Sequence, residues 1–199
     1  QTVSDLHRTA EPSLRFDGST NAVNDNVTST TGGVTGDSPR TMMGWIKYES
    51  TSVGTGQPIP FSLGGTAGSN GSFALVLLLN GTHVNVYGQA GGNDETDIAV
   101  SKNVVDGKWH HLVVTYTPLA GSTAPNIKIY ADGVEVGSRN RETTTAYATT
   151  AGWVIGDWAN TDRPWNGEVK SFSAHNRALA DTEVAAAYNG ESTPWKYAD

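Results

Sequence analysis

The chain has 199 residues and lacks several features that would direct a reading of its function. It has no cysteine, which excludes disulfides, thiol redox chemistry and a thiolate metal site. There is no run of lysine or arginine, and 13 basic residues against 20 acidic ones give a net charge of −7. Nucleic acid is therefore not an expected partner, because such binding depends on neutralising phosphates. No apolar stretch approaches the roughly 20 residues that cross a bilayer, so membrane insertion is not expected either.

The amino terminus also lacks a recognisable signal peptide, and the first residue is Gln1 rather than methionine. We expect that a leader or a preceding domain has been removed. The length suits one domain, because β-sandwiches of this size are often undivided.

The residues that are present indicate β-structure. The chain contains 23 glycines, and short β-branched runs separated by turn residues are typical of a sandwich. A helix is predicted over 181–188, with Asp181 as its cap and Asn189-Gly190 at its end. Strands are predicted over 13–16, 41–48, 58–63, 73–79, 84–88, 109–117, 126–131, 134–137, 152–156 and 168–175.

A series of motifs spans most of the chain in a fixed order. They are LRFDG (14–18), MGWIK (43–47), DGKWHHLVVTY (106–116), IKIYADGVEVG (127–137), WVIG (153–156), WNGEVKSFSAHNRAL (165–179) and DTEVAAAYNG (181–190). This combination resembles the laminin-G-like, concanavalin-A-type jelly rolls of bacterial and phage proteins. The resemblance implies an all-β fold, a two-sheet antiparallel jelly-roll sandwich over 1–190 with one short C-terminal helix. Residues 191–199 would then be a linker or tail.

The adjacent His110 and His111 suggest a metal site at first sight. Successive side chains of a strand point to opposite faces, so the two rings cannot bind one ion together. We therefore predict structural roles for both histidines, and a packing role for Trp165 in the Trp-Asn-Gly turn.

Catalysis is not expected, although the same fold hosts glycoside hydrolases and lyases. Glycoside hydrolysis needs two carboxylates about 5–9 Å apart, and no E-x-D-x-E segment is present. Asp94, Glu95 and Asp97 follow glycines, and we assign them to a solvated loop. There is also no G-x-S-x-G nucleophile motif. A glycan-active enzyme of this fold is kept as an alternative.

The resemblance also implies a structural Ca²⁺ near the FDG turn, for which Asp17, Asn21 and Asp25 could supply oxygen ligands. Many family members carry an Asp-Glu pair where this chain has Lys170 and Ser171. We therefore expect Lys170 to replace the ion by pairing with Asp17, and no cofactor to be required.

A polar loop over 156–165 contains a tryptophan that could stack on a sugar ring. The predicted ligand-binding residues in this loop are Trp158, Asp157, Asn160, Asp162 and Arg163. A second polar loop could line the same rim through Asn93 and Asp94. The alternative for Trp158 is packing beneath its own loop.

These observations favour a non-catalytic carbohydrate-binding or receptor-binding adhesion module of a secreted or cell-surface protein. The alternative is a structural or host-recognition domain of a phage virion, in a tail or head fibre. The expected location is extracellular or in the virion. The expected partners are a glycan or glycoconjugate surface and, where the chain is longer, other domains.

Overall fold

The computed structural model describes residues 12–18, 26–49, 57–64, 71–77, 82–89, 94–118, 126–140, 149–157 and 163–191. Its strands are β1 (Leu14–Asp17), β2 (Val27–Ser29), β3 (Arg40–Tyr48), β4 (Phe61–Gly64), β5 (Ser72–Leu77), β6 (His83–Gln89), β7 (Asp94–Ala99), β8 (Trp109–Tyr116), β9 (Ile127–Ala131), β10 (Val134–Arg139), β11 (Trp153–Ile155) and β12 (Asn166–His175). The helix is α2 (Asp181–Glu191).

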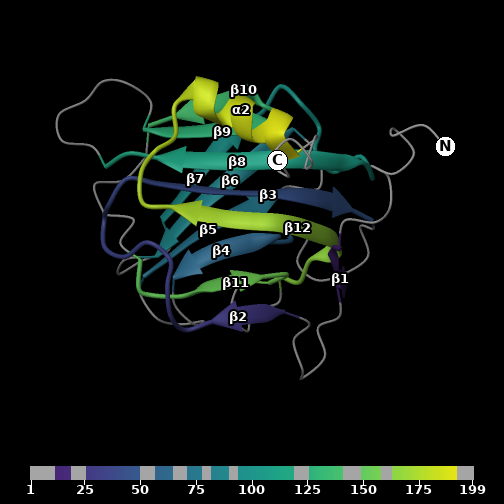
Figure 1. Ribbon diagram of the computed structural model, residues 1–199, viewed down its shortest axis with the longest axis horizontal. Helices are drawn as coiled ribbons and strands as arrows, with labels where there is room; N and C mark the ends of the chain where they lie inside the picture. The colour runs from purple at the N-terminus through teal and green to yellow at the C-terminus, as the bar shows by residue number, and fades with distance from the viewer. Residues whose placement is uncertain are drawn as a thin grey trace, which may run out of the picture.

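The strands form two antiparallel sheets that pack face to face (Figure 1). Sheet A has the order β1-β12-β3-β8-β9-β10, and sheet B has the order β2-β11-β4-β5-β6-β7. Helix α2 lies across the outer face of sheet A, over β8, β9 and β10. The predicted two-sheet sandwich with one C-terminal helix is confirmed.

The main core lies between the two sheets, because alternate residues of each strand point inward. From sheet A it includes Ile46 and Leu112, and from sheet B it includes Phe61 and Leu75, all fully buried. Trp165 is also fully buried, with its ring centroid 5.2 Å from that of Tyr48. The packing role predicted for Trp165 is thereby confirmed.

The hairpin between β9 and β10 turns at Asp132-Gly133, as the sequence indicates. Val134 pairs with Ala131, and the two turn residues have φ angles of 52° and 80°. Two positive φ angles are what a tight I′ turn requires, and Asp-Gly is one of the pairs that adopts it readily.

Helix α2 is held to sheet A by an apolar cluster. Leu179, just before the helix, and Val184 pack on Met43, Val113 and Tyr130. None of the described segments forms a helix long and apolar enough to cross a membrane.

Two details of the predicted helix were wrong. The helix continues through Asn189 and Gly190 to Glu191. Its cap is Ala180, whose carbonyl accepts the first helical bond from Val184 N at 3.0 Å, while Glu183 reaches back to Ala180 N at 2.9 Å. Asp181 instead accepts hydrogen bonds from Tyr130 Oη at 2.8 Å and Lys128 Nζ at 3.0 Å. The carboxylate therefore fastens the helix start to β9, and the capping is done by the glutamate.

Strands β2 and β7 were not predicted. The assignment of Asp94, Glu95 and Asp97 to a solvated loop was wrong, because all three belong to edge strand β7. Thr96 and Ile98 point inward and are buried, so Asp97 points away from the core. Its side chain is half exposed and lies 3.9 Å from His83 Nε2.

Candidate functional site

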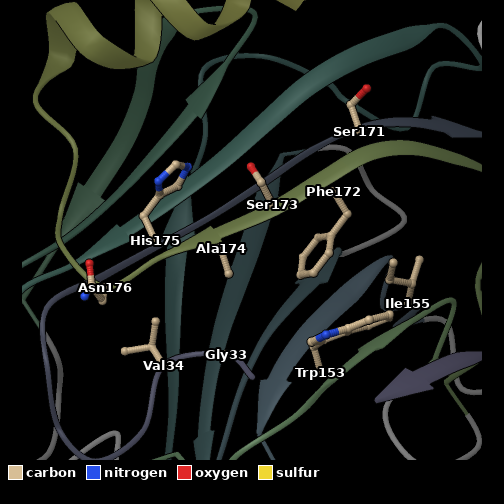
Figure 2. Close-up of a pocket in the computed structure, with 10 residues that line it drawn as sticks. All are labelled: Gly33, Val34, Trp153, Ile155, Ser171, Phe172, Ser173, Ala174, His175 and Asn176. Carbon is tan, nitrogen blue, oxygen red and sulfur yellow. The ribbon is translucent and has the colours of Figure 1, made fainter. Parts of the chain in front are cut away.

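A cavity of about 810 Å³ opens between the two sheets, where the second half of β12 faces β11. Its walls come from Gly33 and Val34, from Trp153 and Ile155 of β11, and from residues 171–176. Figure 2 shows these three segments around the cavity. A cavity of this size falls in the range of small-molecule sites.

The shape of β12 at the cavity results from a β-bulge. Pairing passes from Lys170↔Trp45 to Ser173↔Met43, so Ser171 and Phe172 together stand opposite Gly44 alone. Ser171 has a φ of 52°, which is strained for a residue other than glycine. A Cβ on Gly44 would make only an ordinary contact with Phe172 Cα at 3.5 Å but a tight one with Phe61 Cε1 at 3.2 Å, so the glycine leaves room for the Phe61 ring opposite the bulge. Bulges re-aim side chains and are common beside functional sites.

The bulge turns two apolar side chains toward the cavity. Val169 points into the core, and after the extra residue Phe172 and Ala174 also pack against the core. Figure 2 shows Phe172 directed toward Trp153. The Phe172 ring centroid lies 5.3 Å from that of Phe61 and 6.0 Å from that of Trp153. These rings form an aromatic floor that leads from the core to the partly exposed Trp153.

The serines and the histidine among residues 171–176 face the cavity mainly with their backbone atoms. In Figure 2 the side chains of Ser171, Ser173 and His175 point to the opposite side of β12. Strand β1 pairs only with 166–169 of β12. Beyond Val169, no strand in the described part of the chain pairs with β12 on the side away from β3. The cavity therefore has an aromatic floor, and one of its walls is a strand edge that no strand of the described residues covers.

The predicted binding loop begins next to this cavity. Asp157 comes two residues after Ile155 and is only 2% exposed, and Arg163 is half-buried. Hydrogen bonds fix both ends of the loop: Trp165 N donates to Gly156 O at 2.8 Å, and Ile59 N to Arg163 O at 3.2 Å. Trp158, Asn160 and Asp162 lie outside the described residues.

The second predicted loop starts from the opposite end of sheet B. Asn93 lies outside the described residues, and Asp94 is the first residue of β7. The turn from β6 to β7 is at the end of the sheet where Gln89 pairs with Ser72, and Ser72 with Gly64. Loop 156–165 leaves the other end, where Ile155 pairs with Phe61. Three strands also separate β11 from β7, so the sheet does not place the two loop bases on one rim.

The calcium site that the resemblance implies lies mostly outside the described residues and stays a prediction. Asp17 ends β1 opposite Asn166, while Asn21 and Asp25 lie outside the described residues. Within the described ranges, no group of three or more His, Asp or Glu could hold a metal ion. At the family's acidic positions, Lys170 Nζ lies 5.0 Å above the Trp109 ring and 5.5 Å above that of Trp45, and Ser171 forms the bulge.

The expected pairing of Lys170 with Asp17 was wrong. Asp17 is opposite Asn166, and Lys170 is four residues further along β12, about 13 Å away at the usual strand rise. The ammonium is directed to the outer face of sheet A by the alternation of the strand.

The two adjacent histidines point to opposite faces, as predicted. His110 Nδ1 is 2.9 Å from Asp132 and its Nε2 is 2.9 Å from Asp106. Burial would raise the pKa of Asp106, but hydrogen bonds from His110 and Lys108 outweigh it and lower the pKa to about 2. His111 packs against Trp45 and Tyr188, and burial lowers its pKa to about 4, although Asp132 opposes this shift. Both roles are structural.

Sequence reasoning missed the cavity and its two rings, Trp153 and Phe172. One signal was available. In a regular strand, inward-pointing residues recur at every second position, as Phe172 and Ala174 do. Val169, however, is followed by Phe172 three positions later. A spacing of three in an alternating strand indicates a bulge.

These features agree with a family assignment. The sequence model of the concanavalin A-like lectin/glucanases superfamily matches residues 18–185, so the chain belongs to this family. No curated protein matches the chain.

Solved structures share the fold at low sequence identity. The SAP-like pentraxin of Limulus polyphemus, a heptamer, has a TM-score of 0.66 at 16% identity, covering 88% of this chain and 81% of its own. Domain 4 of an extracellular GH43 arabinanase from Geobacillus stearothermophilus, solved with arabinotriose, has a TM-score of 0.57 at 18% identity, covering 81% and 71%. The ligand-binding domain of botulinum neurotoxin serotype D, solved with N-acetylneuraminic acid, has a TM-score of 0.62 at 14% identity. The match covers 90% of this chain and 42% of the neurotoxin domain.

Proposed function

We propose that this domain is a non-catalytic carbohydrate-binding module and that the cavity between β11 and β12 holds the sugar. The observation that carries the proposal is the partly exposed ring of Trp153 at the floor of a cavity, one wall of which is a strand edge that no described strand covers. Aromatic rings stack on the apolar faces of sugars, and peptide groups can hydrogen-bond their hydroxyls. Two structures that share the fold were solved with saccharides, which supports this ligand class.

Loop 156–165 extends the proposed site. It leaves β11 directly after the cavity residue Ile155, and Trp158 and its polar neighbours stay predicted ligand-binding residues. The adhesion role, the virion role and the extracellular location stay predictions.

The proposal is tested by presenting the full chain to a glycan array and measuring the affinity of the strongest saccharide by calorimetry. Trp153→Ala should weaken binding by about 1–3 kcal/mol if the ring is a central contact. Trp109→Ala is the matched control, because Trp109 is also partly exposed but lies on the outer face of sheet A beneath Lys170. Trp158→Ala, measured alongside, shows whether loop 156–165 contributes.

Binding that survives Trp153→Ala but is lost in Trp158→Ala would move the site to the loop. A wild-type chain that binds no saccharide would contradict the proposed function.

The enzyme alternative has one structural observation in its favour, since Glu95 and Asp97 occupy alternate positions of β7. We expect no hydrolysis of the bound saccharide by the wild type. Release of reducing ends that Asp97→Asn abolishes would overturn the non-catalytic assignment.

A further inference from the structure

One wall of the cavity is a loop segment fastened to the start of β11. Gly36 N donates to Thr149 O at 2.8 Å, Thr149 N donates to Gly36 O at 3.2 Å, and Gly152 N donates to Gly32 O at 2.9 Å. Val34 lies between these bonds, and Trp153 directly follows Gly152. The separation of the wall from the aromatic floor therefore depends on how these two segments are joined.

A buried arginine joins the same segments. Arg40, the first residue of β3, is 0% exposed, and its guanidinium lies over the rings of Phe73 and Tyr116, 5.4 and 5.5 Å from their centroids. Its Nη1 donates to Thr149 Oγ1 at 2.7 Å, its Nη2 to Gly36 O, and its Nε to Ser38 O at 3.0 Å. Burial lowers the pKa of Arg40 to about 10, so it is charged at neutral pH and its hydrogen bonds are charge-assisted.

Thr149 connects the Arg40 guanidinium to Val34 in the cavity wall by hydrogen bonds. A hydroxyl has one proton to donate, and Thr149 Oγ1 donates it to Val34 O while accepting from Arg40. Arg40, Thr149 and Val34 thus form a continuous chain of hydrogen bonds that ends at the cavity. The fixed fork of the guanidinium keeps Gly36 O and Thr149 Oγ1 at set positions relative to each other.

We infer that Arg40 is a positioning residue, which acts through Thr149 to hold the Val34 wall against the Trp153 floor. Neither residue lines the cavity. The consequence for ligand affinity rests on the proposed function, whereas the consequence for the wall does not.

The test compares three threonine variants of the full chain. Thr149→Val removes the hydroxyl and leaves the shape, and Thr149→Ser restores a hydroxyl. Thr41→Val is the matched control, because Thr41 is also buried and its hydroxyl also makes two hydrogen bonds. It accepts from Leu179 N at 2.9 Å and donates to Arg177 O at 2.8 Å, which joins β3 to residues 177–179.

The first measurement is amide hydrogen exchange by NMR, which needs no ligand. Thr149→Val should speed exchange of the Gly36 and Gly152 amides about tenfold, the effect of losing a hydrogen bond, and leave the Leu179 amide unchanged. Thr41→Val should do the reverse, and Thr149→Ser should resemble the wild type. Equal exchange at Gly36 and Gly152 in Thr149→Val and Thr149→Ser would overturn the inference.

The second measurement is calorimetric affinity for the saccharide found on the array. Thr149→Val should weaken binding about tenfold, with Thr149→Ser and Thr41→Val near the wild type, even where Thr41→Val lowers the melting temperature as much. Faster exchange with unchanged affinity would show that the wall does not determine binding. A wild type that binds no saccharide contradicts the proposed function, and the exchange data then decide the inference alone.

Discussion

The two long sides of the sandwich differ in how the sheets meet. On the closed side, defined by β7 and β10, Ser101 N donates to Val136 O at 2.9 Å and Arg139 Nη1 donates to Asp97 O at 2.7 Å. On the open side, defined by β11 and β12, the cavity separates the sheets. The sandwich is thus closed where backbone and side chains reach across to the other sheet, and open where the bulged part of β12 faces β11 across the cavity.

Glycine shows how close the approach is on the closed side. A Cβ on Gly137 would lie 2.5 Å from Ala99 O, a distance that real structures do not tolerate. On the open side the sheets are less close at Gly44, because a Cβ there would lie no nearer than 3.2 Å to any atom, the nearest being Phe61 Cε1.

The largest expected effect comes from truncating one isoleucine on each side. Ile98 is 2% exposed on the closed side, and Ile155 is 6% exposed at the cavity. We expect Ile98→Ala to lower the free energy of unfolding by about 4 kcal/mol and Ile155→Ala by about 2 kcal/mol, because Ile155 already borders empty space. Urea unfolding measures both, and equal losses would remove the energetic distinction between the sides.

The effect of acid on the free energy of unfolding tests a third region, the face of sheet A that α2 covers. This region belongs to neither the closed nor the open side. His111 has a folded pKa of about 4, below its unfolded value, because it is buried. Above pH 6.5 both states are neutral. As the pH falls toward 4 the unfolded state gains the proton first, so stability falls. The expected loss is about 2 kcal/mol between pH 7 and pH 5.

His111→Phe should flatten that part of the stability curve, measured by urea unfolding at each pH. The pH interval stays above the range in which Asp106 protonates. An unchanged slope in His111→Phe would assign the acid sensitivity to another group.

Adding one methyl group at each glycine tests the closeness of approach. Gly137→Ala should cost about 2 kcal/mol and Gly44→Ala less than about 1 kcal/mol, since only the first forces the backbone apart. Val134→Ala on β10 is the control, because Val134 is 65% exposed and the change should cost under about 0.5 kcal/mol. Thermal melting is sufficient, and a larger loss at Gly44 would reverse the comparison.

The smallest effect is expected from chelation. Asp17 ends β1 on the open side, where a calcium ion would brace the edge. We expect EDTA to leave the melting temperature nearly unchanged, because Lys170 and Ser171 occupy the positions where many relatives have carboxylates. A drop of many degrees that added Ca²⁺ restores would show that an ion stabilises the native state by mass action.

The sequence predicts the parts of this fold that depend on local pattern. The strand around Leu112 and the hairpin at Asp132-Gly133 follow from alternation and turn chemistry, and both are confirmed. Strand β7 could not be predicted in this way, because its polar residues resemble a loop and its pairing with β6 stabilises it.

The candidate site was less accessible to prediction because long-range pairing creates it. The cavity lies beyond the point on β12 where pairing with β1 ends, at the pair Leu14 and Val169, and beside the bulge that faces Gly44. Neither pairing can be read from the residues that line the cavity. The composition of the loop around Trp158 indicates hydrogen-bonding capacity but not the position of a hollow.

The unpaired second half of β12 has a consequence for how binding could change during evolution. Alternate peptide groups of an edge strand point outward whatever side chains it carries. A ligand held by these groups would keep those contacts when Ser171 or Ser173 is replaced, since their side chains point to the other side of the strand. Ser171 is itself restricted by its φ of 52°, which few side chains adopt without strain. Selectivity would therefore change mainly through Trp153, Val34 and the loop that follows β11.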